Sequence, residues 1–494
     1  MGLAMNTPRV TSMPQPFYQS SSHDETVRLP HRLLLLSYHF PPSVLVGGMR
    51  WLQMSRYLAE KGWGLDVVAG DFSKLTVRDE ATLRSLPPNV RVFSAAEPES
   101  PLATVERSLR LMFRRVFPRR SPPPETPALA REVALKSLDS RSLIRAYGSL
   151  ISVDRERLWA KRAAQIGTEL ARGQHYDAIV SSGPVHMAHE GARQIAKAVG
   201  RPLVIDFRDP WSGVERVVDD HASPVWYALA RFYEGRAVRA ASLALMNTDR
   251  SREYMRALYP GAAHRIITVA NGNDDEAVSP AERPDRFTIR YAGTIYLDRD
   301  PRPLLRAAAL VIRRHGLTPG QFGIETIGSE SFNDKGLKAI ADEEGIAEFI
   351  EAGPRRPRLD AMRFLAGATM LVNLPQDSSM CVPAKLFEYV QFNAWLLVLA
   401  VEESATADVL RNTSADVVDP HDVDGIAAVI ERRYLQYARG EKPEAVGKDG
   451  RFDRVRQVDV FLDHLRPIVN GRARAVVPAA MNEAASAHSE TMGL

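Results

Sequence analysis

The stretch MCVPAKLFEYVQFNAWLLVLAV, residues 380–401, decides the fold because it reads as a short helix that leads into a buried strand. Pro383 suits the first position of a helix, and the serines just before this stretch can cap that helix. Residues 395–401 are an apolar run of strand length without alternation, which is typical of a parallel strand covered on both faces. The pattern therefore predicts an α/β fold with a parallel sheet.

Two charged residues of the same helix, Lys385 and Glu388, are three positions apart and share one side. The start of a helix carries unpaired N–H groups and the positive end of the dipole, so a phosphate could bind there together with Lys385. Glu388 could then accept hydrogen bonds from sugar hydroxyls, which describes a nucleotide-sugar pocket. The same residues also fit an ordinary amphipathic helix with a solvated lysine and a solvated glutamate.

The segment PAKLFEY, residues 383–389, followed by a strand, resembles the donor-site helix of family 4 glycosyltransferases, which are retaining enzymes of the GT-B fold. The fullest version of that motif has two glutamates, and the second contacts the ribose of the nucleotide. Glu388 matches the second glutamate. The sequence departs from the motif at the first, where Met380 stands, and some bacterial members also lack that glutamate.

At 494 residues the chain is too long for one hydrophobic core and suggests two or three domains. A membrane-spanning helix needs about twenty apolar residues, and no apolar run of the sequence approaches that length. The single cysteine, Cys381, excludes an intramolecular disulfide and a cysteine-built metal cage, which fits a cytoplasmic protein. A net charge of +4 is too small to imply a nucleic-acid partner.

The first predicted domain, residues 29–278, opens with a strand, a glycine loop and a helix, after a Ser- and Pro-rich tail at 1–28 that is expected to be disordered. Gly47 and Gly48 let the backbone approach an anion where the helix starts, and Arg50 adds positive charge. In family 4 enzymes a loop of this form lies at the interdomain cleft, near the donor diphosphate and the acceptor. The alternative is a glycine turn needed only for packing.

The segment PLVIDFRDPWSG, residues 202–213, is predicted to be a strand that presents Asp206, Arg208 and Asp209 at its carboxyl end. Open α/β sheets bind ligands at that edge. The segment resembles the DFRDPW segment of bacterial family 4 enzymes, which faces the reacting sugar from the acceptor side. The resemblance implies that Asp209 receives the acceptor proton or orients its hydroxyl and that Arg208 contacts phosphate or sugar. An ion cluster of the three side chains that holds the loop is the alternative, and both can hold together.

Between residues 98 and 158 the alternation of strands and helices lapses, which predicts an insertion. Within it, ERSLRLMFRRVFPRR at 106–120 forms an apolar stripe flanked by six arginines if it is helical. Such a helix can lie in a membrane interface and makes an anionic membrane surface a possible partner. The alternative is that the stripe packs on the protein and the arginines are solvated or pair with acidic side chains.

The second predicted domain, residues 279–448, again opens with a strand, a glycine loop at Gly293 and a helix. The same architecture thus begins twice, which indicates two facing Rossmann-like domains. The loop YAGTIY resembles the glycine loop of family 4 enzymes, and Arg299 and Arg302 lie where many members bind the donor diphosphate; alternatively, either arginine is solvated on the first helical turn. By the same resemblance, residues 449–469 form a helix that crosses back to the first domain, and a disordered tail at 470–494 follows.

These features together predict a GT-B fold with a nucleoside-diphosphate sugar in the second domain and the acceptor in the first. The resemblance implies retaining transfer to a carbohydrate or lipid-linked acceptor, in the cytoplasm or at the inner face of the plasma membrane. No cofactor or metal is expected, because helix dipoles and basic side chains stabilise the leaving phosphate. His186 and His189 have no third zinc ligand at a recognisable spacing and are expected to be solvated or capping. A nucleotide-sugar epimerase and a non-catalytic sugar-nucleotide-binding protein are the alternatives.

Overall fold

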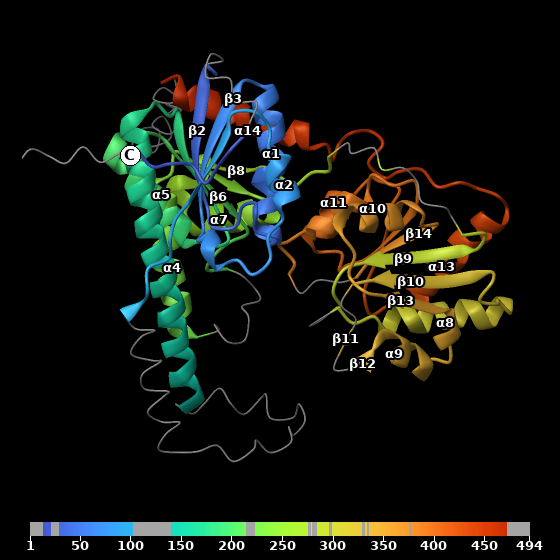
Figure 1. The fold of residues 1–494 in the computed structure, drawn as a ribbon. Helices are drawn as coiled ribbons and strands as arrows, with labels where there is room; N and C mark the ends of the chain where they lie inside the picture. Colours follow the sequence, from blue (N-terminus) through green and yellow to red (C-terminus); the bar gives the residue numbers. More distant parts are fainter. Residues whose placement is uncertain are drawn as a thin grey trace, which may run out of the picture.

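A computed structural model describes residues 13–20, 29–101, 140–213, 223–274, 278, 284–295, 299–328, 331–332, 335–374 and 378–471. Within them the chain forms two α/β halves, which lie side by side in Figure 1, each around its own sheet. The Arg-rich helix predicted at 106–120 and most of both predicted tails lie outside the described residues.

The first half is built on a sheet of eight described strands. They are β1 (Tyr18–Gln19), β2 (His31–Ser37), β3 (Trp63–Ala69), β4 (Val90–Ser94), β5 (Ala178–Ser182), β6 (Leu203–Arg208), β7 (Leu243–Met246) and β8 (Ile266–Thr268). The order is β1-β4-β3-β2-β5-β6-β7-β8, and β2 to β8 are parallel. The order reverses between β2 and β5, so the carboxyl ends of these two strands form the point where open α/β sheets bind ligands.

The apolar run of β2 shows why this sheet is buried on both faces. Leu34 and Leu36 pack into one hydrophobic core, whereas Leu33 and Leu35 pack into the core on the opposite face. All four side chains are fully buried, and replacing one of them by alanine would cost about 2–5 kcal/mol. Strand alternation thus divides one leucine run between two cores.

Helices cover both faces of the first sheet (Figure 1). They are α1 (Met49–Glu60), α2 (Glu80–Arg84), α4 (Ser140–Gly173), α5 (Met187–Val199), α6 (Pro224–Ala240) and α7 (Asp249–Leu258). Residues 140–158 of the segment predicted as an insertion form the first part of α4. Ile151, Val153 and Trp159 of α4 are buried, and Trp159 donates a hydrogen bond from Nε1 to the carbonyl of Ala69, 3.3 Å away.

The tail predicted to be disordered at residues 1–28 is ordered in part. Tyr18 and Gln19 pair with Val92 and Arg91 at the edge of the sheet, and the ring of Phe17 packs on Phe72 with 4.8 Å between centroids. An exposed sheet edge accepts such a strand through backbone hydrogen bonds, which composition does not reveal.

The second half contains a six-stranded parallel sheet within the described residues. Its strands are β9 (Phe287–Ala292), β10 (Phe322–Ile327), β13 (Ile350–Gly353), β14 (Met370–Asn373), β15 (Trp395–Leu399) and β16 (Asp416–Val418), in the order β13-β10-β9-β14-β15-β16. The order reverses between β9 and β14, which makes their carboxyl ends the second ligand-binding edge. A short hairpin of β11 (Ser331–Phe332) and β12 (Lys335–Gly336) lies outside this sheet.

The helices of the second half pack on its sheet and leave the carboxyl edge to loops. They are α8 (Arg302–His315), α9 (Leu337–Glu343), α10 (Arg358–Ala366), α11 (Ala384–Tyr389), α12 (Ala405–Leu410) and α13 (Val423–Ala438). The stretch at 380–401 forms α11 and β15, as its pattern predicts. Leu386 and Tyr389 of α11 face the core, which leaves Lys385 and Glu388 near the carboxyl edge.

The last described helix, α14 (Arg454–Val469), returns to the first half and lies beside α1 (Figure 1). Phe461 packs edge-on against Trp51 with 5.9 Å between ring centroids, and Leu462 and Leu465 are buried in the same core. At its start, Arg454 donates from Nε to Asp274, 2.7 Å away. No helix among the described residues is long and apolar enough to span a membrane.

Candidate functional site

Glycines end three neighbouring strands at the carboxyl edge of the second sheet. Gly293 and Gly328 follow β9 and β10, and both have a φ of 146°, which residues with a side chain rarely adopt. Gly293 donates its N–H to Ile327 at 2.9 Å, and Gly328 donates to Gly353 at 3.0 Å. At these glycines the carboxyl edge of the second sheet therefore presents backbone that carries no side chain of its own. Gly328 was not predicted, although the same pattern of an apolar strand followed by glycine signals it.

Lys385 of α11 lies beside this edge. Its Nζ donates to the hydroxyl of Tyr291 at 2.7 Å and to the carbonyl of Ala292 at 3.2 Å. The same ammonium takes the space that a side chain on Gly293 would need. Burial, and after it the positive charge of Arg299, lower the pKa of Lys385 to about 7, and the charge of Glu388 opposes this shift. Lys385 therefore titrates near neutral pH, and a bound anion would favour its charged form.

The two predicted arginines have different surroundings. Arg299 donates to the carbonyl of Thr294 at 3.1 Å and lies close enough to Lys385 to affect its pKa. Arg302, the first residue of α8, is ion-paired with Asp300, with 2.5 Å between Nη2 and Oδ2. The structure thus gathers Gly293, Arg299 and Lys385, whereas Asp300 holds Arg302 at the start of α8.

Glu388 lies one turn after Lys385 on α11. Its Oε1 is 3.5 Å from Nε of Arg358, the first residue of α10. The side chain of Glu388 is 36% exposed, so the carboxylate is accessible to a ligand as well. Arg358 was not predicted as a site residue; the basic run PRRPR at 354–358 was the available signal.

In the first half, Gly47 and Gly48 are explained by the folding of their own loop. A Cβ on Gly48 would lie 2.8 Å from the carbonyl oxygen of His39, and a Cβ on Gly47 would lie 2.7 Å from the ring of His39. Either contact is too short for a real side chain. The packing alternative therefore accounts for both glycines, and a role toward an anion stays a prediction.

Arg50 is an internal residue, which corrects its predicted role as charge for an anion. Its guanidinium donates to Asp206 at 3.0 Å and to the carbonyl of Val269 at 2.7 Å. Trp51 donates from Nε1 to the same carboxylate at 2.7 Å, and Ser182 donates at 3.1 Å. These bonds hold α1 against the ends of β5, β6 and β8. Asp206 thus has the structural role that the ion-cluster alternative predicted for it.

Arg208 joins the two loops at the switch point of the first sheet. Its backbone has a φ of 67°, and its Nη1 donates to the carbonyl of Gly47 at 3.1 Å and to that of Gly183 at 3.3 Å. Its buried Nε has no hydrogen-bond partner in the part of the chain that the structure describes. Burial lowers the pKa of Arg208, and the charge of Asp206 opposes this.

Asp209 faces the second half. Burial raises the pKa of Asp209; the charge of Arg208 and a side-chain hydrogen bond from Cys381 of the second half lower it. Arg208 and Asp209 of the first half and the segment before α11 are thus brought together across the two halves. A carboxylate in such a place can orient a hydroxyl group or accept its proton.

His186 and His189 are neither solvated nor capping, which corrects the prediction for them. His186 stacks on Trp211 with 5.1 Å between centroids and makes no capping hydrogen bond to α5. Its Nδ1 is 3.3 Å from Nε2 of His189, and Nδ1 of His189 is 2.9 Å from the hydroxyl of Ser181. Burial lowers the pKa of His186 to about 3. Among the residues described, no three or more His, Cys, Asp or Glu side chains gather as they would around a metal ion.

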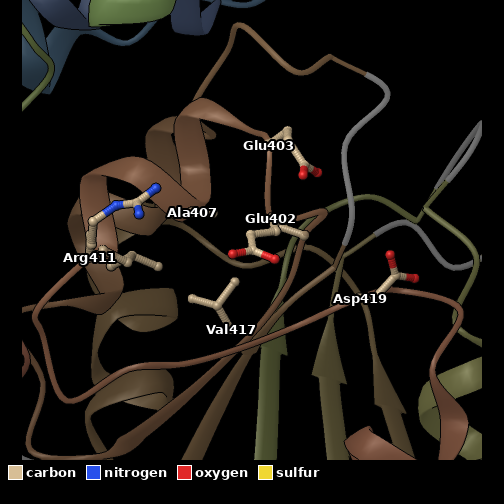
Figure 2. A pocket seen from close by; sticks show the side chains of 8 residues that line it. Glu402, Glu403, Ala407, Arg411, Val417 and Asp419 are labelled. Carbon is tan, nitrogen blue, oxygen red and sulfur yellow. The ribbon is translucent and has the colours of Figure 1, made fainter.

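A pocket of about 530 Å³ lies beyond the carboxyl ends of β15 and β16, beside α12. Figure 2 shows Glu402, Glu403 and Asp419 around it, with Arg411 on the α12 side. Three carboxylates against one guanidinium give a negative lining, which disfavours a diphosphate. The edge with Gly293 and Lys385 is therefore the better candidate for an anionic ligand.

No family model matches the chain. A D-inositol 3-phosphate glycosyltransferase from Thermobifida fusca is 24% identical over 228 residues, which are 43% of this chain and 52% of that protein. The protein of the same name from Mycobacterium ulcerans is 27% identical over 212 residues, 40% of this chain and 43% of that protein. The match thus spans about half the length of these curated relatives.

Solved structures resemble almost the whole chain. Sucrose-phosphate synthase from Thermosynechococcus elongatus matches with a TM-score of 0.58 at 12% identity, over 89% of this chain and 100% of that one. Anabaena HepE in complex with UDP and glucose matches with a TM-score of 0.53 at 14% identity, over 88% and 99%. A UDP-forming α,α-trehalose-phosphate synthase from Burkholderia xenovorans matches with a TM-score of 0.53 at 13% identity, over 89% and 99%. The chain therefore has the GT-B fold, with two Rossmann-like domains, as its sequence predicts.

Proposed function

We propose that the protein is a glycosyltransferase that moves a sugar from a nucleoside-diphosphate sugar to an acceptor. One observation carries the proposal. The side chains of Lys385 and Glu388 lie on α11 near Gly293, at the carboxyl edge of the second sheet, and Asp209 of the first domain lies near the segment that precedes α11. The names of the curated relatives, which are glycosyltransferases, support the same reaction.

The donor is assigned to the second domain. Lys385 and Arg299 supply positive charge for the diphosphate, and the bare backbone at Gly293 allows its close approach. Glu388 accepts hydrogen bonds from the ribose hydroxyls. A uridine nucleotide is the first base to test, since HepE and an Escherichia coli structure with UDP-2-fluoro-glucose have this fold with uridine nucleotides bound.

The acceptor is assigned to the first domain, beside Arg208 and Asp209. It is a carbohydrate, either free or linked to a lipid, in the cytoplasm or at the inner face of the plasma membrane. Support for a lipid-linked acceptor comes from the loop before Gly47, where Val44 and Leu45 are 42% and 52% exposed. Such apolar side chains at the mouth of a site can contact a lipid tail.

The reaction breaks the bond between the anomeric carbon and the diphosphate and forms a bond from the acceptor oxygen to that carbon. We infer family 4 membership and retention of configuration from the resemblance in sequence, with both bonds on the same face of the sugar. Asp209 orients the acceptor hydroxyl or takes its proton, while Lys385 and Arg299 offset the charge that develops on the leaving diphosphate. No step in this scheme uses a cofactor or a metal ion.

Thermal-shift screening against UDP-, GDP-, ADP- and dTDP-sugars tests the donor assignment. One nucleotide series should raise the melting temperature, and Lys385→Met should reduce that shift. A folded protein whose melting temperature responds to none of them contradicts the proposal. An epimerised nucleotide sugar formed without acceptor would favour an epimerase, and binding without turnover would favour a binding protein.

A further inference from the structure

The backbone carbonyl of Met380, in the second domain, makes a contact with the first. It accepts a hydrogen bond from the hydroxyl of Thr248 at 2.6 Å and another from the hydroxyl of Ser251 at 3.1 Å. Thr248 is the N-cap of α7 in the first domain, and both Thr248 and Ser251 are buried. Two hydroxyls of one domain thus hold a single peptide group of the other.

The segment around Met380 is also fastened within its own domain, by α12. Ala405 donates its N–H to the carbonyl of Ser379 at 2.7 Å. The hydroxyl of Thr406 donates to the carbonyl of Cys381 at 3.3 Å. This part of the backbone is therefore held from both domains.

An ion pair joins the two helices that contact this segment. Arg250 of α7 donates from Nη2 to Oδ1 of Asp408 of α12, 3.3 Å away. The two side chains are 34% and 36% exposed, and solvent weakens an ion pair of this kind. The buried hydroxyl bonds to Met380, rather than this ion pair, therefore set the position of the segment.

The segment around Met380 leads into α11, the helix that carries Lys385. The other end of α11 is held by Tyr389, whose hydroxyl accepts the N–H of Ala292 at 3.0 Å. The N-cap of α11 is Pro383, whose ring restricts the backbone between the two fixed points. A shift at Met380 would therefore move the first turn of α11, where Lys385 lies.

We propose that Thr248 and Ser251 of the first domain are positioning residues for α11 of the second, an inference that rests on the proposed function. Their hydroxyls act through the carbonyl of Met380 rather than on the nucleotide. Binding of the donor by the second domain therefore depends on contact with the first. Where the sequence resemblance places a sugar-binding glutamate, this chain uses the backbone of Met380 to join its domains.

Calorimetry of UDP binding to Ser251→Ala tests the proposal, because this change removes one bond to Met380, adds no charge and leaves the N-cap of α7 in place. The affinity should fall about two- to tenfold, which corresponds to the net contribution of one hydrogen bond. Ser55→Ala is the matched control. It removes a buried hydroxyl that donates to the carbonyl of Leu52 at 2.6 Å within the first domain, and it should leave the affinity unchanged. Equal affinities of wild type and Ser251→Ala overturn the proposal.

Two variants of Thr248 separate positioning from helix capping, since its side chain also accepts the N–H of Ser251 at 3.1 Å. Thr248→Asp keeps an acceptor for the cap but has no hydroxyl to donate to Met380. At high salt, which screens the added charge, this variant should bind UDP as weakly as Ser251→Ala and melt near the wild-type temperature. Thr248→Ser keeps both bonds and should restore the affinity. Wild-type affinity in Thr248→Asp refutes the role of this residue.

Hydrogen exchange of the peptide that spans α11 tests the positioning without any nucleotide. In the ligand-free protein, Ser251→Ala and Thr248→Asp should each speed exchange of this peptide, because its first turn opens more readily, whereas Ser55→Ala should not. Unchanged exchange in both variants contradicts the proposal. If neither UDP nor a nucleotide sugar binds the wild-type protein, the proposed function fails, and exchange still decides whether the first domain positions α11.

Discussion

The ammonium of Lys385 donates a hydrogen bond to the hydroxyl of Tyr291, 2.7 Å away, and lies 4.1 Å from the centroid of the same ring. This pair ties α11 to the end of β9, across the point where the strand order reverses. It also keeps a lysine with a lowered pKa beside the backbone of Gly293. The proposed donor site thus contains a charge that depends on pH near neutrality.

We therefore expect donor binding to weaken as pH rises above 7. Burial lowers the pKa of Lys385 to about 7, and a bound diphosphate would raise that pKa because it favours the charged form. Binding then takes up a proton above pH 7, and the affinity should fall by up to about tenfold per pH unit there. Calorimetry of UDP binding in buffers of different ionisation enthalpy measures this uptake. The Lys385→Met variant should show no such proton uptake. Equal proton uptake by the wild-type protein and the variant would mean that Lys385 does not bind the diphosphate.

Glu388→Ala should weaken donor binding by roughly ten- to a hundredfold, since a charge-assisted hydrogen bond contributes about 1.5–3 kcal/mol. Arg358→Ala is the control, because it breaks the half-exposed ion pair with Glu388 but leaves the carboxylate. That pair contributes about 0–1 kcal/mol, so the control should stay folded and bind nearly as well. Equal affinities of wild type and Glu388→Ala in calorimetry would refute the ribose contact.

Asp209→Asn should lower turnover while donor binding stays nearly intact. The substitution keeps the shape of the side chain and removes the charge that would orient the acceptor hydroxyl or take its proton. Steady-state kinetics with the best donor, beside UDP calorimetry, separates the two effects. Loss of donor binding with unchanged turnover at saturation would assign Asp209 to the donor instead.

Arg50→Met should destabilise the protein by about 3–5 kcal/mol, because it leaves the fully buried carboxylate of Asp206 without its cation. Urea unfolding measures this difference. Lys61→Met is the control: its partner Asp459 is about half exposed, and breaking that pair should cost about 0–1 kcal/mol. A small effect of Arg50→Met would show that its other partners, rather than this ion pair, hold α1 in place.

Salt-sensitive association with anionic vesicles is the prediction for the Arg-rich segment at 106–120. Each basic residue near anionic lipid contributes about 1 kcal/mol, so replacing Arg110, Arg114 and Arg115 by Glu should abolish sedimentation with the vesicles. Neutral vesicles serve as the control. Failure of the wild-type protein to sediment at low salt would favour a soluble acceptor.

The sequence predicted what depends on local pattern. The leucine run at residues 33–36 and the stretch at 380–401 specify buried strands and a short helix by themselves, and glycine after a strand predicted the edge at Gly293. Arg50 was misread because a cation at a helix start resembles an anion ligand; its partner Asp206 is 156 residues away along the chain. The hydrogen bond of Thr248 to the carbonyl of Met380, 132 residues away along the chain, was not predicted for the same reason. Pairing across domains depends on tertiary structure, which no local spacing reveals.

Turnover of a labelled nucleotide sugar tests the central claim most directly. The wild-type protein, incubated with radiolabelled sugars of the series that raises its melting temperature, should release the nucleoside diphosphate and transfer or hydrolyse the sugar. Lys385→Met in the second domain and Asp209→Asn in the first should each reduce that rate by tenfold or more (about 1.4 kcal/mol in the barrier). A folded wild-type protein that binds the nucleotide sugar but never breaks its glycosidic bond would contradict the account.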